Sequence, residues 1–435
     1  MKNFLKSLTF LVLWLVWQDV FSVMEIEITE GVEGAHPIAI AAFSGDTYIE
    51  PGAVESIVRS NLWRSGLFNV LEPQHFPQVV TDPSRLHFQL WREAGVESLL
   101  IGTITRAAED QYRIEFRLYD LVRQKRLSGH VISSVSSKDV RKVGHKISDM
   151  VFESLTGIRG SFSTHIVYVR AVRNSPDTKY ELRVADFDGH NARTVFSSAT
   201  QLMSPTWSPD GTRLAYVSFE GGNSAIYVQD VVKGTRFRVS AQTGMNSAPA
   251  WSPDGRYLAL TLSIEGSSDI YLMDTQTRRL RRITSGLASD TAIDTEACWM
   301  PDSKALLFTS DRSDGTQVYR VSVRDRKVER ITFQGKYNAA PDVSPDGRYV
   351  AMVHNGGNGF RIAVMDLKSG AMRVLTDGNM DEGPSYAPNG KMIIYATLKH
   401  GREVLAAVSS NGRARQQLQA AGGNVRAPDW SSFHD

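Results

Sequence analysis

The second half of the chain alternates between short strand-like runs and clusters of turn residues, and this alternation repeats. Apolar, aromatic and β-branched side chains dominate the runs at residues 213–219, 256–262, 304–309, 348–353 and 391–396. Runs of this length and composition, separated by Gly, Pro, Asn and Asp, predict β-strands. The pattern therefore indicates an all-β region that is built from repeated units.

A short motif stands before each of these strands. It reads SPTWSPDG at residues 204–211 and APAWSPDG at 248–255, with degraded copies at 297–303, 340–347, 383–390 and 427–431. Its anchor positions hold Trp207, Trp251, Trp299, Val343, Tyr386 and Trp430. Successive anchors lie 44, 48, 44, 43 and 44 residues apart. A strand-bearing repeat of about 40–45 residues is typical of the blades of a β-propeller.

Each repeat is predicted to hold four strands. In Ser-Pro-Asp-Gly, Pro sets φ for the first corner of a turn, Asp bonds to the local backbone, and Gly follows. Third strands that end near an aspartate are predicted at residues 225–230, 269–274, 317–323 and 361–366. Outer edge strands are predicted at residues 235–240, 280–284, 328–332 and 372–376. Four short strands that are joined by turns make one blade.

The ring is predicted to close with six blades. Residues 164–170, 180–186 and 193–197 hold three strands with no motif before them, whereas the last motif, at 427–431, has no strands after it. Together these segments make one blade, whose innermost strand comes from the C-terminus. Such a closure leaves no open edge in the ring. We therefore expect an all-β six-bladed β-propeller over residues 162–431, closed by the C-terminal strand.

The first third of the chain predicts a different architecture. Residues 1–22 have the pattern of a secretory signal peptide, with Lys2 and Lys6 before an apolar run at 8–17 that is too short to span a bilayer as a helix. Residues 23–160 mix predicted strands at 36–43, 68–71, 97–104, 112–121 and 126–134 with predicted helices at 51–64, 84–94 and 136–155. The expected fold class is an α/β N-terminal domain followed by the propeller.

Charge, cysteine content and motifs exclude several functional classes. The 435 residues carry a formal net charge of +2, which is too small to indicate nucleic-acid binding. The single cysteine, Cys298, is predicted to be a buried apolar residue. The sequence holds no Gly-x-Ser-x-Gly elbow and no His-Glu-x-x-His pattern, and the aspartate of Ser-Pro-Asp-Gly recurs once per blade, as a turn residue would. We therefore predict that the protein is not an enzyme.

A binding surface is predicted where the inter-blade loops meet around the central channel, because sites concentrate on exposed loops of rigid scaffolds. The residues selected there are Met245, Asn246, Thr295, Glu296, Asn338, Asp381, Glu382 and Arg426. Asp290 and Asp294 belong to a loop that is four residues longer than its counterparts and is expected to protrude. Several acids at one rim suit a basic partner peptide or a divalent cation in the channel, and no other cofactor is predicted.

Five longer stretches make the chain similar to one bacterial family. They read EIEITEGVE at 25–33, HPIAI at 36–40, FESLTGIRGSF at 152–162, YELRVAD at 180–186 and LMSPTWSPDG at 202–211. In this order they resemble the TolB family, the periplasmic propeller proteins of the Tol–Pal system in Gram-negative bacteria, over nearly the whole chain. The resemblance implies a non-catalytic scaffold in the periplasm.

The resemblance also implies two protein partners. The peptidoglycan-associated lipoprotein Pal would bind at the mouth of the propeller, where family contact positions fall on Met245, Asn246, Thr295 and Glu296; the family commonly has His where Met245 stands. TolA would bind the mature N-terminal peptide, which is formed by Glu25, Ile26, Glu27, Ile28, Thr29, Glu30, Gly31 and Val32. This peptide would be free or packed back on the protein, and the two binding events would be coupled. Such an adaptor would support outer-membrane integrity and constriction during cell division.

Two other classes of function stay open at this point. One is a propeller hydrolase or small-ligand-binding protein that uses the acids of the channel mouth, and turnover that is lost in Asp381→Ala would favour it. The other is a structural propeller whose partner site lies on the α/β domain. Deletion of residues 25–33 without loss of either partner would favour this third class.

Overall fold

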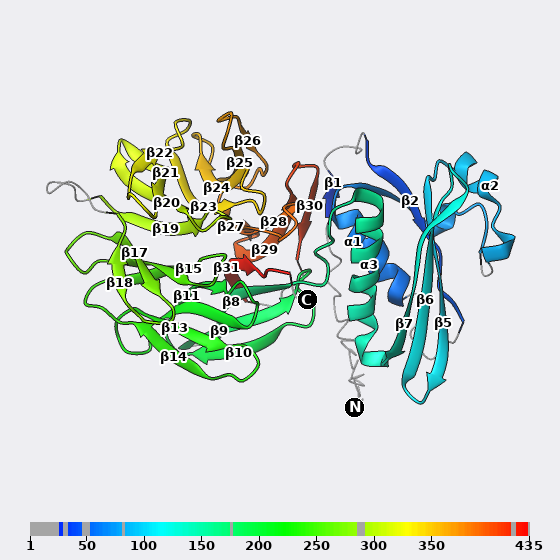
Figure 1. The fold of residues 1–435 in the computed structure, drawn as a ribbon, viewed down its shortest axis with the longest axis horizontal. Coiled ribbons are helices and arrows are strands. Elements are labelled where there is room, and N and C mark those ends of the chain that lie inside the picture. The colour runs from blue at the N-terminus through cyan, green and yellow to red at the C-terminus, as the bar shows by residue number, and fades with distance from the viewer. Residues whose placement is uncertain are drawn as a thin grey trace, which may run out of the picture.

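The chain folds into an α/β domain and a β-propeller that lie side by side (Figure 1). The computed structural model describes residues 26–28, 34–45, 53–80, 83–174, 177–284, 292–418 and 423–433. The predicted signal peptide lies outside the described residues. None of the helices that are described is long and apolar enough to cross a membrane.

The α/β domain is built on one mixed sheet with the strand order β4-β2-β5-β6-β7, in which β2 is parallel to β4 and β5. The strands are β2 (His36–Ile40), β3 (Ser44–Gly45), β4 (Phe68–Leu71), β5 (Ser98–Ala108), β6 (Gln111–Asp120) and β7 (Lys125–Val135). The helices are α1 (Ala53–Arg64), α2 (Phe88–Glu93) and α3 (Val140–Thr156). Side chains of β2 alternate between two cores: Ile38 packs in the core that contains α1 and α3, and Ala39 packs in the core that contains Trp91 of α2.

Two of the predicted helices begin later than the sequence pattern indicated. The helix predicted from residue 84 starts at Phe88, because residues Pro83–Arg85 form a separate 3-10 turn. The helix predicted from residue 136 begins with the 3-10 turn Ser137–Asp139. The Ser136 hydroxyl donates to the Asp139 carboxylate at 2.8 Å and does not cap a backbone N–H. Local side-chain bonds of this kind compete with the first helical turn.

The described residues of the propeller form six antiparallel blades, as the repeat predicted. From the innermost strand outward, blade one contains β31 (Asn424–Trp430), β8 (His165–Asn174), β9 (Asp177–Asp186) and β10 (Arg193–Ser198). Blade two contains β11 (Leu202–Trp207), β12 (Arg213–Ser218), β13 (Ala225–Asp230) and β14 (Arg236–Ser240). Blade three contains β15 (Asn246–Trp251), β16 (Tyr257–Leu262), β17 (Asp269–Asp274) and β18 (Leu280–Arg282).

The other three blades repeat this arrangement. Blade four contains β19 (Asp294–Trp299), β20 (Ala305–Ser313), β21 (Gly315–Ser322) and β22 (Val328–Arg330). Blade five contains β23 (Tyr337–Val343), β24 (Tyr349–Asn355), β25 (Arg361–Asp366) and β26 (Met372–Val374). Blade six contains β27 (Glu382–Tyr386), β28 (Met392–Lys399), β29 (Arg402–Ser409) and β30 (Ala414–Gln417).

The C-terminal strand closes the ring, which confirms the predicted closure. β31 pairs antiparallel with β8, with Trp430 opposite Ile166. Hydrogen bonds between neighbouring blades reinforce this seam. The backbone N–H of Trp207 donates to Asp429 at 2.7 Å, and the backbone N–H of Trp430 donates to the Ser385 hydroxyl at 3.0 Å.

Blade six carries a fifth strand from the other end of the chain. β1 (Ile26–Ile28) pairs antiparallel with β30, with Ile26 opposite Gln416 and Ile28 opposite Ala414. This strand lies between the propeller and the α/β domain (Figure 1). The described part of the N-terminal peptide is therefore packed back on the protein, which is one of the two arrangements that the family resemblance implied.

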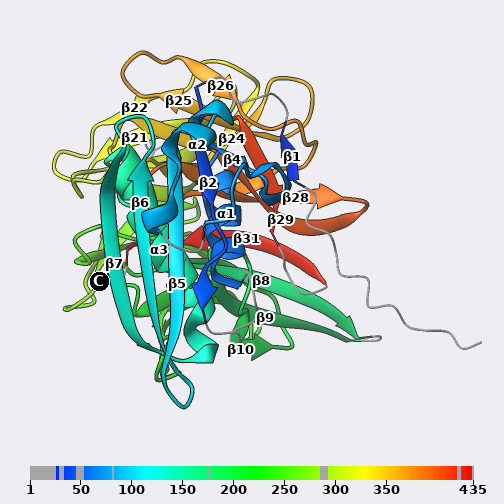
Figure 2. The same ribbon diagram turned by 90° about the vertical axis from the view of Figure 1, so that its right-hand side faces the viewer.

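The two domains share one hydrophobic core. Rings of Phe152 in α3, Phe162 in the connecting segment, Phe187 in blade one and Trp430 in β31 follow one another, with centroids 5.6, 5.5 and 6.3 Å apart. Seen from the α/β side, this domain lies in front of blades one and six (Figure 2). Each large side chain that is buried in such a core contributes about 1.5–3 kcal/mol to the free energy of folding. Packed side chains therefore hold the two domains together.

Candidate functional site: the mouth of the propeller

A bulge at the same repeat position shapes the channel in every blade. The innermost strands lose regular pairing at residues with positive φ, which are Ser204, Ala248, Glu296, Ala340, Gly383 and Ala427. Five of the six are small, and a proline follows each of these five. Blade four departs from this pattern, because it has Glu296 followed by Ala297. A β-bulge redirects the side chains beside it, so the bulge sets which residues face the mouth.

Four polar residues lie five positions before the anchors of blades three to six, and their side chains are buried. They are Asn246, Asp294, Asn338 and Asp381. Asn246 accepts hydrogen bonds from the Ser240 hydroxyl at 2.7 Å and the Gln242 backbone N–H at 2.9 Å, and it donates to the Gln242 carbonyl. Asp294 forms a salt bridge with Arg312 at 2.6 Å. We call these four residues the loop clamps, because they hold the inter-blade loops in place.

The other two loop clamps have the same role. Asn338 donates to the Gln317 side chain at 2.9 Å and to the Gln334 carbonyl at 2.7 Å. The two oxygens of Asp381 accept from the hydroxyls of Thr376 and Thr397 at 2.5 and 2.6 Å. A buried polar group that makes such bonds stabilises its loop and is not free to meet a partner. Three of the residues selected from the sequence, Asn246, Asn338 and Asp381, are thus placed beneath the surface of the mouth.

The remaining selected residues reach solvent at the rim. Met245 is 46% exposed, Glu296 and Glu382 are exposed, and Thr295 is half-buried. Glu296 also accepts a hydrogen bond from the Thr309 hydroxyl at 2.9 Å and one from the backbone N–H of the neighbouring blade at 3.0 Å, so its carboxylate is held in place. These rim residues lie three, four or six positions before the anchor of their blade, whereas the loop clamps lie five positions before it.

Acidic groups gather at one side of this rim. Arg426, which is half-buried, pairs with Glu403 at 3.2 Å. Although Glu382 reaches solvent, the protein atoms around it displace part of its hydration and raise its pKa; the negative charges of Glu403 and Glu296 raise this pKa further, whereas Arg426 lowers it. Around Glu382, two further carboxylates, of Glu403 and Glu296, thus lie near a single cation, Arg426.

Large apolar side chains are also exposed around the mouth. They are Met245, Ile264, Ile293, Phe333, Met380 and Leu398, and each is between 41% and 73% exposed. All six lie in or beside the inter-blade loops and the hairpins between second and third strands, which share one face of the ring. The sequence analysis missed all except Met245. Apolar residues at turn positions, where other blades have polar ones, were the signal. Exposed apolar groups that cluster in this way mark interaction surfaces.

The channel below the rim is a cavity of about 550 Å³ with two acids near its floor. Asp342 accepts the backbone N–H of Tyr386 at 2.6 Å, and Asp429 accepts that of Trp207 at 2.7 Å. Burial raises the pKa of Asp342 to about 7 and that of Asp429 to about 6. Cys298, which was predicted to be a buried apolar residue, is half-buried and is one of the residues that line the same cavity, next to the anchor Trp299.

The N-terminal peptide is described only in part. Ile26, Glu27 and Ile28 form β1, and its pairing with β30 is a backbone arrangement. Glu25, Thr29, Glu30, Gly31 and Val32 lie outside the described residues. The same holds for Asp290 in the lengthened loop.

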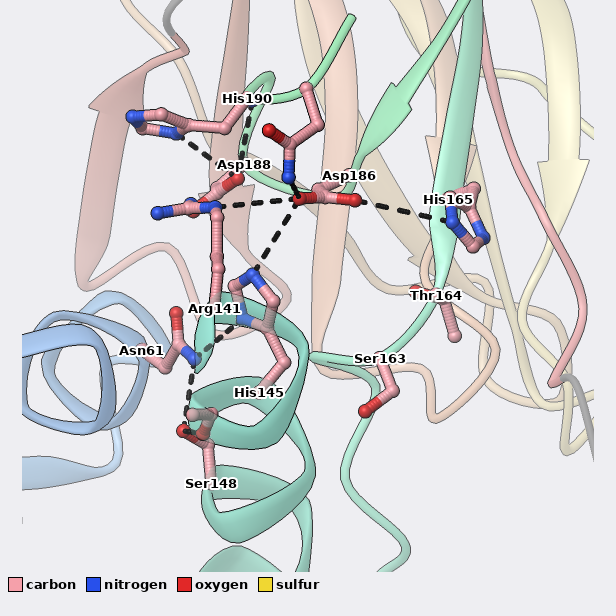
Figure 3. A network of polar contacts seen from close by, with 12 residues as sticks. Asn61, Arg141, His145, Ser148, Ser163, Thr164, His165, Asp186, Asp188 and His190 are labelled. Atoms are coloured by element: carbon pink, nitrogen blue, oxygen red, sulfur yellow. Dashed lines mark hydrogen bonds and ion pairs between the residues drawn. The ribbon is translucent and has the colours of Figure 1, made fainter. Parts of the chain in front are cut away.

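A second polar site, which the sequence analysis missed, lies at the domain junction (Figure 3). Among the described residues, His145, Asp186 and Asp188 bring possible metal-ligand atoms within 4.8 Å of one another. Two guanidinium groups already compensate these acids, because Arg64 and Arg141 both pair with Asp188. The charges at the junction therefore favour an internal salt-bridge network over a metal ion.

The fold and the site define a class of protein: a six-bladed β-propeller that is joined to an α/β domain and presents a rigid mouth of exposed apolar and acidic side chains. Comparison with known proteins identifies the family. Residues 152–434 match the model of the TolB beta propeller domain, and residues 24–127 match that of the TolB amino-terminal domain. The chain belongs to the TolB family.

Individual relatives cover almost the whole chain. The Tol-Pal system protein TolB of Thioalkalivibrio sulfidiphilus is 51% identical over 415 residues, which are 95% of this chain and 94% of that protein. That of Hydrogenovibrio crunogenus is 48% identical and covers 95% of each chain. The crystal structure of TolB from Acinetobacter baumannii superposes with a TM-score of 0.85 at 36% identity, over 94% of this chain and 100% of that one. These relatives confirm the family resemblance.

Proposed function

We propose that the protein is a periplasmic, non-catalytic adaptor of the Tol–Pal system. Membership of the TolB family supports this proposal, since relatives that match the chain from end to end carry the name of that system. The adaptor binds the lipoprotein Pal at the mouth of the propeller and TolA through its N-terminal peptide. In this role it supports outer-membrane integrity and constriction during cell division.

The main support for the proposal is that buried and exposed residues have different roles at the mouth. Loop clamps such as Asn246 and Asp381 are buried and fix the loops, while the exposed rim presents Met245, Glu296 and Glu382 on that fixed base. A preorganised surface loses little conformational entropy when a partner binds. Exposed apolar groups with a few charged neighbours are typical of the energetic centre of a protein interface. The proposed partner segment therefore combines apolar side chains with a basic group.

The N-terminal peptide has the properties of an exchangeable strand. In the part of the peptide that the structure describes, three residue pairs join β1 to β30, from Ile26 with Gln416 to Ile28 with Ala414. A short strand at the edge of a sheet can undock at modest cost. Once released, its backbone and its alternating side chains suit addition to a sheet edge of a partner. The two binding events are coupled only if the mouth partner prefers one of the two states of the peptide.

Calorimetric titration with the periplasmic domain of Pal tests the proposed mouth. The double variant Glu296→Lys/Glu382→Lys reverses the charge of the rim. We expect it to weaken binding by about 100-fold, because reversed charges meet the same partner groups. The matched control Asp302→Lys/Asp325→Lys changes the net charge equally on exposed turns of the opposite face of blade four, and it should bind like the unmodified protein. Equal affinity of the two double variants would contradict the proposal.

Deletion of residues 25–33 tests the TolA site. The truncated protein should lose measurable binding to the periplasmic part of TolA while it keeps its thermal unfolding transition, because β1 is the outermost strand of the sheet of blade six. A scrambled peptide of the same composition at this position is the control. Binding of TolA that survives both changes would place its site elsewhere.

A divalent cation is a candidate ligand of the channel. Asp342 and Asp429 line the cavity, and oxygen atoms are the ligands that Ca²⁺ prefers. We propose that Ca²⁺ raises the midpoint of thermal unfolding through these two acids. The double variant Asp342→Asn/Asp429→Asn should abolish that rise. An equal rise in the double variant and the unmodified protein would exclude these residues as the ligands.

A further inference from the structure

Blade one departs from the repeat at the turn that follows its third strand. In blade two this turn begins at Asp230, whose carboxylate accepts the backbone N–H groups of Val232 at 3.0 Å and Lys233 at 2.7 Å. Blades three and five use Asp274 and Asp366 in the same way. Blade one has Asp186 at this position, followed by Phe187 and Asp188. Phe187 and Asp188 depart from the pattern of the repeat and lie in the junction between the two domains.

Asp188 is the centre of the junction. It is 1% exposed, and one of its oxygens accepts hydrogen bonds from Arg64 of α1, at 2.9 Å, and from Arg141 of α3. Its other oxygen lies 3.2 Å from the ring of His190. Burial alone would raise the pKa of Asp188, but the hydrogen bond from His190 and the two guanidinium groups hold it far below its usual range. The carboxylate is therefore ionised and ties three segments together.

A second layer of polar groups supports this centre (Figure 3). Asn61 of α1 donates to His145 of α3 at 2.9 Å and to the Ser148 hydroxyl at 2.9 Å. Burial lowers the pKa of His145 to about 4, so the ring is neutral at neutral pH. The Nε2 atom of His145 faces Asp186 at 3.9 Å. With Asp188, these residues form what we call the junction cluster: Asn61, Arg64, Arg141, His145, Ser148, Asp186, Asp188 and His190.

The junction cluster is joined to the channel through aromatic rings. Phe187, between the two aspartates, stacks on Trp430 at 6.3 Å and meets the ring of His145 at 5.3 Å. Trp430 follows Asp429, which lines the channel and accepts the Trp207 N–H of blade two. The same strand, β31, carries Arg426 at the rim. A shift of β31 at the mouth would therefore move the ring on which Phe187 stacks.

The other side of the junction cluster reaches the seat of the N-terminal strand. Helix α1 ends at Arg64, and Gly66, two residues later, packs against blade six. A Cβ atom at Gly66 would lie 2.8 Å from the Cβ of Ala414, so the backbones are in close approach. Ala414 is the residue of β30 that pairs with Ile28 of β1. A change in the position of α1 would thus be felt at the strand that holds β1.

We propose that the junction cluster, centred on Asp188, transmits between the channel mouth and the docked N-terminal strand. This inference rests on the proposed binding of one partner at the mouth and of another by the N-terminal peptide, and it names the residues that regulate their exchange. The residues of the cluster act by position, since they touch neither partner surface. The two states that the cluster biases are β1 paired with β30 and β1 released.

Physical chemistry favours such a role for buried charges. An ion pair that is removed from water tolerates few geometries, because its desolvation is offset only while its partners stay aligned. A small displacement of Asp188 relative to Arg64 or Arg141 therefore carries a large cost, unlike the displacement of an apolar contact. Elements that are joined in this way move together or separate, and such discrete behaviour turns a small shift into a switch.

Backbone amide exchange in the full mature chain tests the proposal without any partner. Asp188→Asn keeps the shape of the side chain and removes its charge. We expect exchange of residues 26–28 and 414–417 to become about tenfold faster in this variant. Asp230→Asn, at the matching turn of blade two, should leave these amides unchanged. Equal exchange at these residues in both variants would overturn the proposal.

A milder variant keeps the test decisive if Asp188→Asn fails to fold. His190→Ala removes the imidazole that lies 3.2 Å from Asp188 and leaves both arginines and the backbone N–H of residue 190 in place, and His190 is 31% exposed, so the fold should tolerate it. It should accelerate exchange at residues 26–28 by about threefold. Unchanged exchange at residues 26–28 in His190→Ala would count against the cluster as the link.

A binding cycle separates this inference from the proposed function. The affinity for the periplasmic domain of Pal is measured with and without residues 25–33, in the unmodified protein, Asp188→Asn and Asp230→Asn. Truncation should change the affinity about fivefold in the unmodified protein and in Asp230→Asn, and leave it unchanged in Asp188→Asn. A truncation effect that persists in Asp188→Asn, or is absent from the unmodified protein, refutes the link. Absence of binding by every protein refutes the proposed mouth instead, and the amide exchange still decides on the cluster.

Discussion

Blades one and two begin the turn after the third strand with the same residue type and use it differently. Asp230 of blade two lies in a solvent-exposed turn and bonds its own backbone. Asp186 of blade one is followed by Phe187 and the buried Asp188, which reach into the α/β domain. A position that keeps to the repeat thus stabilises its own blade, whereas a position that departs from the repeat makes contacts outside the blade.

The same comparison holds at the mouth. The loop clamps recur in four consecutive blades and are buried. Glu296 stands where the other five blades have a small residue, and it is exposed at the rim. The two positions are two residues apart in each of these four blades. Departure from the repeat therefore separates candidate contact residues from structural ones better than charge does.

We expect the largest loss of stability from substitution of Asp188, the buried aspartate of blade one. Asp188→Ala leaves Arg64 and Arg141 buried without their carboxylate, and it should lower the free energy of unfolding by about 3–5 kcal/mol. Asp230→Ala removes two hydrogen bonds of an exposed turn, for which water can substitute, and should cost much less. Urea denaturation, followed by intrinsic tryptophan fluorescence, measures both. Losses of similar size would show that the two aspartates are equivalent.

The second comparison predicts opposite consequences for neighbouring residues of blade six. Asp381→Ala leaves the hydroxyls of Thr376 and Thr397 without their acceptor and should lower the free energy of unfolding by about 1–3 kcal/mol. Glu382→Ala should change it by no more than about 0.5 kcal/mol, since this side chain is exposed. Thermal unfolding of the two variants provides the measurement. A larger loss in Glu382→Ala would reverse the assignment of clamp and rim.

A smaller effect concerns Asp342 in the channel and Asp210 in an exposed turn. Because the pKa of Asp342 is raised to about 7, the folded state keeps its proton between pH 4 and pH 7, and the stabilisation is lost as the pH rises through 7. Asp342→Asn should therefore gain stability relative to the unmodified protein between pH 5 and pH 8. The hydrogen bond from Ser208 and neighbouring backbone groups keep the pKa of Asp210 low despite partial burial, so its contribution is lost only as the pH falls through the acid range.

Asp210→Asn is the matched control for this pH dependence. Its stability relative to the unmodified protein should stay constant between pH 5 and pH 8, and change only in more acidic solution. Urea denaturation at several pH values measures both variants. A constant difference for Asp342→Asn over the same range would contradict the raised pKa.

The smallest expected effect is on the stability of a variant that restores the repeat. Glu296→Ala gives blade four the residue that three other blades have, and it should change the free energy of unfolding by about 1 kcal/mol or less. Binding of Pal should nevertheless weaken by about fivefold, because one acid leaves the rim. Calorimetry for both quantities decides. A large loss of stability without loss of affinity would make Glu296 a structural residue.

Much of the fold could be predicted from the sequence, because each repeat contains turn residues that fix the local backbone. The spacing of anchors from Trp207 to Trp430 predicted six blades, and the unmatched motif at 427–431 predicted the closing strand. The burial of Asn246, Asn338 and Asp381 was not predicted, because polar residues in loops are usually exposed. Only their shared position in the repeat indicates a structural role. Their recurrence five residues before each anchor was the available signal.

The junction cluster could not be predicted in the same way. It brings together residues from α1, α3 and blade one, such as Arg64, Arg141 and Asp188, which are up to 124 positions apart. Which surfaces of two domains meet depends on contacts between residues that are far apart in the chain, and no local pattern reveals these contacts. The only local sign was the second aspartate after β9, which has no counterpart in the other blades.

We propose that Pal binds the mouth of the propeller and not the α/β domain. Amide exchange of the full mature protein, with and without the periplasmic domain of Pal, tests this proposal. We predict that protection appears in the inter-blade loops and hairpins of the mouth, around residues 245, 264, 293–296, 380–382 and 398–403. Protection that is confined to the sheet of the α/β domain, over β5, β6 and β7, would contradict the account.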